Sequence, residues 1–284
     1  MIAIDKRGRL GNQMFQYAFG VAAAERLGTR HSYDTTELER YFALLEPRLM
    51  RKAVQRAVRA YDRFFGLERR EVVADDREDP DEVLASVADH TLYGGHFYSD
   101  HFFRPADAAV RRAFKVHGPH LERFEAKYGS LLGTGYIGAH VRLTDFFTYR
   151  DDVTLPPGYY RRAIGVLDDH LPVVVVSDEP DRVRAAFESD PRIRVEANDE
   201  IVDFLLLQHA THLVSSNSSF AWWAAWLNER PGLRVIAPRW WLGLHARCEL
   251  PVKAIPKDWE QIEPRCPDDG EWPATARPYG SLIQ

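Results

Sequence analysis

Short apolar segments alternate with helix-like segments along the second half of this 284-residue chain. Short apolar runs bounded by turn residues are typical of buried strands, and strands that alternate with helices of about ten residues are joined by right-handed crossovers. The expected strands are residues 136–141, 172–177, 193–195, 212–215 and 233–237, and the expected helices are residues 158–168, 180–188, 200–210 and 219–227. The pattern therefore predicts a mostly parallel sheet covered by helices, which is a Rossmann-like α/β domain.

The first half begins with a strand, a glycine-containing loop and a helix. Residues 2–5 are the expected strand, Gly8 and Gly11 lie in the loop, and an apolar-rich helix is expected from residue 14 to residue 27, ended by Gly28. Glycines permit a tight turn, and the free N–H groups at the start of a helix attract anions such as a diphosphate. The glycine spacing matches neither the P-loop nor the G-x-G-x-x-G fingerprint, so spacing alone favours an ordinary loop.

The next part of the chain is rich in arginine and aromatic residues. A second strand is expected at residues 30–34, and residues 35–67 are predicted to be helical. Residues 48–70 carry many basic side chains together with Phe64 and Phe65. A solvated helical face is the main interpretation of this basic stretch, and a face that binds the acceptor or a membrane surface is the alternative.

The acidic string Asp79-Pro80-Asp81 has the D-x-D form that holds a divalent metal on the diphosphate of a nucleotide-sugar. No apolar strand leads into this string. We therefore assign residues 74–82 to a surface loop and predict no metal site there.

A further strand is expected within residues 91–100, where a glycine pair is followed by histidine and aromatic residues. The side chains expected to line a cleft at its end are His96, Phe97 and Asp100. The domain boundary is placed in the glycine-containing stretch that follows. This gives an N-terminal domain of residues 1–134 and a C-terminal domain of residues 135–284 with an irregular tail.

Composition narrows the range of partners. With 28% charged residues and a net charge of −5, the chain is not typical of proteins that wrap nucleic acid, because those carry a basic stripe. Cys248 and Cys266 form no C-x-x-C pair, so neither a zinc site nor a disulfide framework is expected. The N-terminus shows no signal-peptide pattern, and no apolar run reaches ~18 residues, which predicts a soluble, cytoplasmic protein with at most peripheral membrane contact.

Polar residues follow three of the predicted strands, at the points where these strands end. They are His140, Arg142 and Asp145 after the first, Ser177 and Asp178 after the second, and residues 215–219 after the fourth. The carboxyl ends of parallel strands meet at one edge of the sheet, which is where ligands bind in open α/β folds. The alternative is that His140 is a core histidine and that Arg142 and Asp145 form an ion pair.

The serine-rich stretch precedes a predicted helix. Ser218 or Ser219 is expected to cap this helix, so that hydroxyl groups and free N–H groups point to one place. With Arg142 nearby, that place would hold a phosphate, and Asp178 could accept hydrogen bonds from a base or ribose. Helix capping alone is the alternative role for the serines.

Four stretches carry a resemblance to a known family. They are residues 8–18 (GRLGNQMFQYA), 140–145 (HVRLTD), 177–179 (SDE) and 216–227 (SNSSFAWWAAWL). In this order they resemble the motifs of the α-1,2-fucosyltransferases of glycosyltransferase family 11, and residues 94–100 resemble a further segment more loosely. The resemblance implies an α/β fold of GT-B type, with two Rossmann-like domains facing across a cleft. It also implies inverting transfer of L-fucose from GDP-β-L-fucose to a sugar hydroxyl without an essential metal.

The resemblance also implies residue roles. Arg142 with Ser218 and Ser219 would bind the diphosphate, and His140 and Asp178 would contact guanine or ribose. Gly11 and Asn12 would close the donor site from the N-terminal domain. The remaining residues expected at the donor are Ser177, Asn217 and Phe220. The expected catalytic residues are Arg142, His140 and Asp145, and the general base is one of Asp145, His96 and Asp100. The acceptor is expected to end in galactose, with His96, Phe97 and Asp100 beside it.

The chain departs from the family pattern at three positions. Leu143 stands where a basic residue is common, and Thr144 and Arg9 stand where glycine is common. These differences are expected to affect the conformation of the loop and the fit of the donor more than the type of reaction.

Two other functions compete with this interpretation. One is transfer of a different nucleotide-sugar on the same scaffold, and the other is non-catalytic glycan binding. The tryptophans that could stack on a sugar are Trp222, Trp223, Trp226, Trp240 and Trp241, although helical spacing is more typical of core residues. A serine hydrolase is disfavoured because no G-x-S-x-G elbow is present.

Overall fold

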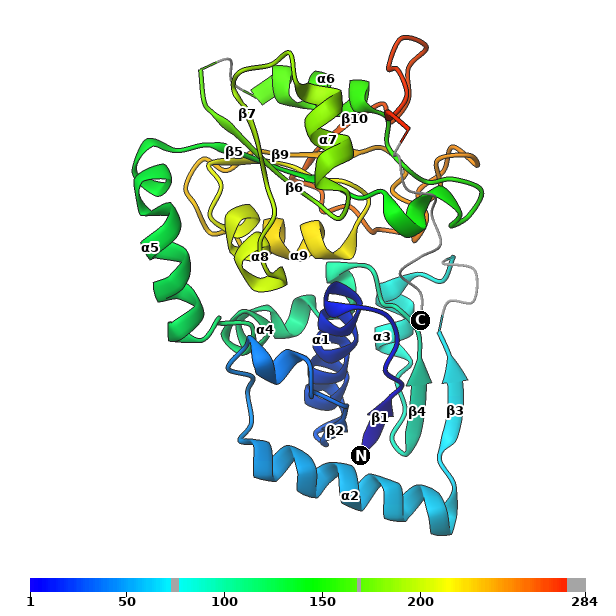
Figure 1. The fold of residues 1–284 in the computed structure, drawn as a ribbon. Helices are drawn as coiled ribbons and strands as arrows, with labels where there is room; N and C mark the ends of the chain where they lie inside the picture. The colour runs from blue at the N-terminus through cyan, green and yellow to red at the C-terminus, as the bar shows by residue number, and fades with distance from the viewer. Residues whose placement is uncertain (73–76, 168–169, 275–284) are drawn as a thin grey trace. The chain divides into compact units, whose positions relative to one another are not determined.

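The computed structural model describes residues 1–72, 77–167 and 170–274, which divide into two units (Figure 1). The first unit contains Met1–Leu121 and Glu249–Pro256, and the second contains Glu122–Cys248 and the described residues from Lys257 onwards. The division thus falls between residues 121 and 122 rather than after residue 134. Residues 249–256 belong to the first unit, although the sequence alone placed them in the second.

Among the described residues, the first unit forms a four-stranded parallel sheet of order β2-β1-β4-β3. The strands are β1 (Ile2–Ile4), β2 (His31–Ser32), β3 (Glu68–Glu71) and β4 (Thr91–Gly94). The helices are α1 (Leu10–Leu27), α2 (Arg48–Phe65), α3 (Pro80–Ala85), α4 (Asp107–Ala113) and the start of α5 (Gly118–Thr134), with 3₁₀ helices at Leu38–Arg40, Asp100–Phe102 and Arg104–Ala106. The chain passes from β1 to β2 on one side and later returns to β4 on the other, so the strand order reverses between β1 and β4.

Helix α1 is the core helix of the first unit. It begins at Leu10, earlier than predicted, because Gly8 turns the chain at φ 70° and the extended Arg9 precedes the first helical residue. It ends at Gly28 in the left-handed conformation, as predicted. Its buried side chains lie on every face, among them Met14, Phe15, Tyr17 and Phe19. Such a helix shows no polar stripe in the sequence because it has no solvated face.

The described part of the second unit forms a six-stranded parallel sheet of order β10-β9-β8-β5-β6-β7. The strands are β5 (Ile137–Val141), β6 (Val173–Ser177), β7 (Ile193–Glu196), β8 (His212–Val214), β9 (Val235–Pro238) and β10 (Glu260–Ile262). The helices are α6 (Pro157–Leu167), α7 (Pro180–Phe187), α8 (Glu200–Gln208) and α9 (Ser219–Trp226), with a 3₁₀ helix at Thr144–Phe147. The parallel sheet predicted from alternation is confirmed, and β10 is an addition. This is the 3-2-1-4-5-6 order of dinucleotide-binding folds, whose switch point lies between β5 and β8.

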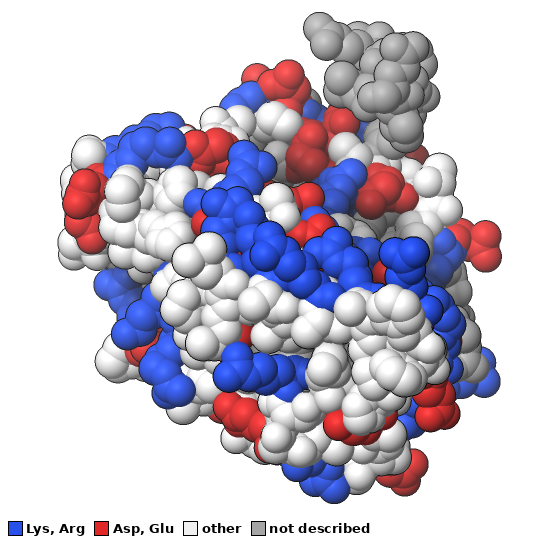
Figure 2. Space-filling view, turned by 90° about the horizontal axis from the view of Figure 1, so that it is seen from below, with Lys and Arg blue, Asp and Glu red and all other residues white. Residues whose placement is uncertain are grey.

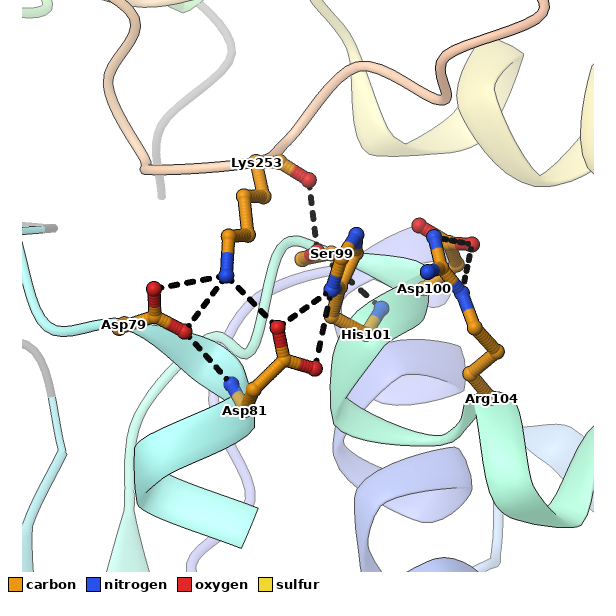
Figure 3. A network of polar contacts seen from close by, with 7 residues as sticks. All are labelled: Asp79, Asp81, Ser99, Asp100, His101, Arg104 and Lys253. Atoms are coloured by element: carbon orange, nitrogen blue, oxygen red, sulfur yellow. Dashed lines mark hydrogen bonds and ion pairs between the residues drawn. The ribbon is translucent and has the colours of Figure 1, made fainter.

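The D-x-D string begins a helix instead of lying wholly in a loop. Asp79 caps α3 by accepting a hydrogen bond from the N–H of Asp81. Both carboxylates also bind the ammonium group of Lys253, at 2.7 Å from Asp79 and 2.6 Å from Asp81 (Figure 3). The Nδ1 atom of His101 lies 2.8 Å from Asp81, and the hydroxyl of Ser99 donates to the Lys253 carbonyl at 2.6 Å. The string therefore fastens residues 249–256 to the first unit.

Helices α1 and α2 each contain 18 residues. Length alone would let such a helix approach the thickness of a bilayer. In residues 1–72, 77–167 and 170–274, however, no helix combines this length with enough apolar character to cross a membrane.

Candidate functional site

The switch point of the second unit is closed by a hydrogen bond between two strand ends. His140 is the penultimate residue of β5, and Ser216 follows β8, which is the neighbour of β5 in the sheet. The Nδ1 atom of His140 lies 2.7 Å from the hydroxyl oxygen of Ser216. The ring of Phe220, in the first turn of α9, lies 5.5 Å from the imidazole between centroids. The structure thus brings two of the predicted donor residues, His140 and Phe220, together with Ser216.

The imidazole of His140 is buried, with 6% of the residue exposed. Burial lowers its pKa to about 4, and the nearby Arg142 adds to this effect, while Asp178 opposes it. His140 is therefore neutral at pH 7, so one ring nitrogen donates a hydrogen bond and the other accepts one. A neutral imidazole suits a hydrogen-bonding role toward a nucleotide better than an electrostatic one.

Arg142 follows β5 directly and is held by two carboxylates. Its Nη1 atom lies 3.0 Å from Asp178, and its Nη2 atom pairs with Asp145. The guanidinium also lies over the ring of Phe146, 5.7 Å from the centroid. Only 14% of the Arg142 side chain is exposed, whereas the Asp145 side chain is 53% exposed. The ion pair between Arg142 and Asp145, which the sequence offered as the alternative to a binding role, is present. Arg142 still lies at the end of β5, where a diphosphate site was expected.

Asp178 organises the loop that follows β5. Its carboxylate accepts hydrogen bonds from the backbone N–H groups of Leu143 and Thr144, at 2.9 Å and 3.2 Å, and from the Thr144 hydroxyl. The Leu143 side chain is fully buried. These are two of the positions where the chain departs from the family pattern, and both stabilise the conformation of the loop. Thr144 donates a hydroxyl hydrogen bond to Asp178, and the Leu143 side chain packs in the core.

The serine-rich stretch divides into capping and supporting roles. Ser218 is the N-cap of α9, since its hydroxyl accepts a hydrogen bond from the N–H of Phe220 at 3.3 Å, and Ser219 is the first helical residue. The predicted cap is thus confirmed at Ser218. Asn217 is buried, and its amide nitrogen donates to the carbonyls of Val153 (2.9 Å) and Trp241 (3.3 Å). Asn217 therefore holds neighbouring loops in place.

Ser177 and three of the tryptophans have structural roles in the second unit. The hydroxyl of Ser177 accepts a hydrogen bond from the N–H of Glu179 at 3.1 Å, which shapes the entry into α7. Trp222, Trp223 and Trp241 are buried in the core. Their rings are surrounded by other parts of the protein and so cannot stack on a sugar. The helical spacing of the α9 tryptophans had indicated such a core position.

In the first unit, one side chain links the loops that follow the two central strands, β1 and β4. The side-chain nitrogen of Gln16 donates to the carbonyls of Arg7, in the loop after β1, and of Gly95, after β4, both at 3.1 Å. The Tyr98 hydroxyl donates to the Asn12 side chain at 3.1 Å. Gln16 and Tyr98 were not selected from the sequence. The sequence feature that could have identified Gln16 is its position as a polar residue within the apolar helix that follows the glycine loop.

The three acceptor candidates lie in different environments. The ring of His96 stacks on Tyr98 at 5.0 Å between centroids. Phe97 is a correction: its ring is 1% exposed and stacks on Phe19 at 4.0 Å, so it belongs to the core and has no surface to offer a sugar. Asp100 begins a 3₁₀ helix and pairs with Arg104 at 2.9 Å.

Neither described unit offers the ligands of a metal ion. Within the described residues, no group of three or more His, Cys, Asp or Glu side chains is arranged to hold a metal ion. The carboxylates of the D-x-D string already bind Lys253.

Comparison with known proteins places this site in a family. The O-antigen biosynthesis glycosyltransferase WbnK of Escherichia coli is 28% identical over 122 residues, which cover 39% of this chain and 40% of that protein. The alpha-1,2-colitosyltransferase of Escherichia coli is 24% identical over 284 residues, which cover 90% of this chain and 97% of that protein. The solved structure of the fucosyltransferase NodZ from Bradyrhizobium aligns with a TM-score of 0.50 at 15% identity, covering 78% of this chain and 90% of that one. This likeness confirms the GT-B-type α/β fold class. Residues 1–260 match the family described as glycosyl transferase family 11, and the chain belongs to that family.

Proposed function

We propose that the protein transfers L-fucose from GDP-β-L-fucose, with inversion, to O2 of a terminal galactose on an oligosaccharide or surface polysaccharide. The observation that carries this proposal is the position of Arg142, which Asp178 holds at the end of β5 next to the switch point. The N-terminus of α9 follows the adjacent strand β8. A guanidinium group and a helix N-terminus both favour the oxygens of a diphosphate.

The mechanism follows from where charge develops. As the bond between fucose C1 and the GDP oxygen breaks, negative charge builds on the diphosphate, and Arg142 with the N–H groups of α9 neutralises it. In this proposal Arg142 and the N–H groups of α9 take the place of a metal ion, so turnover with GDP-fucose is expected to persist in excess EDTA. Neutral His140 orients the nucleotide through a hydrogen bond to guanine or ribose.

Asp145 is the proposed general base in the second unit. Its side chain is half exposed and lies beside Arg142, so an acceptor hydroxyl can approach it from solvent. Removing a general base typically slows turnover ~10²–10⁴-fold. An Asp145→Asn variant is therefore expected to lose kcat with little change in the affinity for GDP. If kcat stayed at the wild-type value, the base would have to be sought at His96 or Asp100.

A second candidate donor comes from the colitosyltransferase relative. Colitose is L-fucose without its 3-hydroxyl group, so one diphosphate site serves either GDP-sugar. The test is a panel of GDP-fucose, GDP-colitose and UDP-sugars with galactose-terminated acceptors, read by nucleotide release and by mass spectrometry of the products. Preference for GDP-fucose supports the proposal, and preference for another donor overturns it. A GDP-induced thermal shift without any product would indicate a binding protein instead.

A further inference from the structure

The outer face of α2 carries two stripes, one basic and one apolar. Residues three or four apart lie on the same side of a helix. The exposed basic stripe is Lys52, Arg56, Arg59 and Arg63, and the exposed apolar stripe beside it is Leu49, Ala53, Ala57, Ala60 and Phe64. The inner side packs into the first unit through Val54 and Val58, which contact Ala3. Both stripes are therefore held outward by the fold.

The basic stripe differs from the first turn of α2 in its ion pairs. Arg48 and Arg51, at the start of α2, both pair with Glu39. By contrast, the described residues include no Asp or Glu that pairs with any of the four side chains of the basic stripe. The helix sequence RLMRKAVQRAVRAYDRFF has six basic residues and one acidic residue, in a chain whose net charge is −5. Figure 2, seen from the side on which α2 lies in Figure 1, shows Lys and Arg side chains gathered in a band. Uncharged surface borders this band on one side, and Asp and Glu side chains lie along the other.

Large apolar side chains project into solvent at both ends of the same helix. Leu49 is 83% exposed near its first residue, and Phe64 and Phe65 are 74% and 77% exposed at its end. Exposed apolar surface of this kind, next to a charged rim, marks an interaction site. Phe64 and Phe65 have bulky rings that gain free energy when they leave water.

We propose that α2 docks on a membrane surface that contains anionic phospholipids. A helix that lies in the plane of the interface needs cations that reach the lipid phosphates and apolar side chains that enter the acyl boundary, and α2 offers both on its exposed side. A second copy of the chain is disfavoured because two unneutralised basic stripes would repel each other. A soluble polyanion would use the basic stripe and leave Leu49, Phe64 and Phe65 without a partner.

The test is co-sedimentation of the full chain with vesicles of phosphatidylcholine, with or without 30 mol % phosphatidylglycerol (a composition on the order of bacterial anionic content). Each Lys or Arg near an anionic surface strengthens binding about fivefold. The K52Q/R56Q/R59Q/R63Q variant is therefore expected to bind anionic vesicles several hundredfold more weakly, on the same scale. The matched control R112Q/K115Q/R239Q/K257Q removes equal charge from exposed positions off α2 and is expected to bind like wild type.

A second variant, F64S/F65S, separates lipid insertion from simple charge attraction. Because it loses the burial of two large apolar side chains, it is expected to bind anionic vesicles at least ~10-fold more weakly. Its binding to heparin, a soluble polyanion, should stay unchanged. Far-UV circular dichroism and thermal melting show whether each variant is folded. The proposal is overturned if wild type binds both vesicle types equally, if the basic-stripe variant binds as tightly as wild type, or if F64S/F65S loses nothing. The last result would point to a soluble polyanion.

Discussion

The Nη1 atom of Arg142 lies 3.0 Å from the carboxylate of Asp178, so an ion pair joins the ends of two adjacent strands. Val141 and Ser177 are opposite each other in the β5–β6 register, and the two charged residues are the first residues after these strands. The strand register therefore sets this pairing. The guanidinium is placed before any ligand arrives, which reduces the entropy lost on binding.

Arg142→Ala should nearly abolish turnover. Loss of a group that stabilises developing charge costs about 3–4 kcal/mol, or 10²–10³-fold in kcat/KM. Arg142→Lys should recover part of the rate, because the charge returns without the two-pronged geometry. Steady-state kinetics with GDP-fucose give the comparison. Arg184→Ala, which removes an exposed arginine on α7 paired with Asp181, is the control and should act like wild type. Wild-type kinetics for Arg142→Ala would refute the assignment of the diphosphate site.

Asp178→Asn distinguishes a positioning role from direct contact with ribose. The variant removes the negative charge that pairs with Arg142, and it weakens the hydrogen bonds from the N–H groups of Leu143 and Thr144. The free energy of unfolding should therefore fall by about 1–3 kcal/mol. If Asp178 acts by positioning, calorimetry should show weaker binding of GDP and unchanged binding of guanosine, which lacks phosphate. The loss of position is expected to outweigh the gain in positive charge. An equal loss for both ligands would instead mean that Asp178 contacts the nucleoside.

His140 should make stability depend on pH in the acid range. Its pKa is lowered from 6.5 to about 4 in the folded chain, so the unfolded state binds more protons between these values. The stabilisation is fully present above pH 6.5 and is lost as the pH falls toward 4. Urea unfolding should show that the free energy of unfolding falls between pH 7 and pH 5 by about 2 kcal/mol more for wild type than for His140→Gln. His31, whose pKa burial also lowers to about 4, affects both proteins equally and cancels. Parallel pH profiles for the two proteins would contradict this.

Gly8→Ala should disturb the loop before α1. Gly8 has φ 70°, and a Cβ atom there would lie 2.0 Å from the side-chain nitrogen of Asn12. The backbone conformation alone costs roughly 1–2 kcal/mol for a non-glycine residue. Gly165→Ala is the control, because Gly165 lies within α6 with open space around it. The control should raise the free energy of unfolding by about 0.5–1 kcal/mol. Thermal unfolding that ranked the two variants in the opposite order would show that the loop tolerates a side chain.

The elements that the sequence predicted best are those with a local cause. The strands β5 to β9 and their helices follow from apolar periodicity and turn residues, and the contacts of His140 with Ser216 and Phe220 follow from the parallel topology of β5 and β8. Contacts between distant residues had no such signal. The hydrogen bonds from Thr144 to Asp178 span 34 residues and depend on strand register. Phe97 is buried against Phe19 with a φ of 59°, a conformation that phenylalanine seldom adopts and that no sequence pattern predicts.

The return of residues 249–256 to the first unit is the largest feature that the sequence did not indicate. The pattern of apolar residues indicates that a segment is partly buried, but it does not indicate which of the two hydrophobic cores the segment packs against. Here the choice is made by polar contacts across 174 and 172 positions, from Lys253 to Asp79 and Asp81. Each is a single charged residue on a part of the surface, and thus looks like any solvated side chain when the sequence is considered alone.

Lys253→Met should loosen residues 249–256 without affecting the second unit. The hydrogen bond from Lys253 holds the pKa of Asp79 below its ordinary value, and for Asp81 the bonds from Lys253 and His101 outweigh the opposing effect of burial. Groups with a lowered pKa stabilise the fold above their unfolded value of 3.8, and this stabilisation disappears as the pH falls through the folded pKa. Wild type should therefore melt at a higher temperature than the variant at pH 7, and the two should converge below pH 3.8.

Hydrogen exchange gives the local measurement for this variant. At pH 7 the amides of residues 249–256 should exchange faster in Lys253→Met, while those of β5 and β6 should be unchanged, because the lost ion pairs lie within the first unit. Lys257→Met is the matched control, since Lys257 is exposed just beyond the segment. It should leave both the melting temperature and the exchange pattern as in wild type. Equal exchange of residues 249–256 in wild type and Lys253→Met would mean that apolar packing alone holds the segment in place.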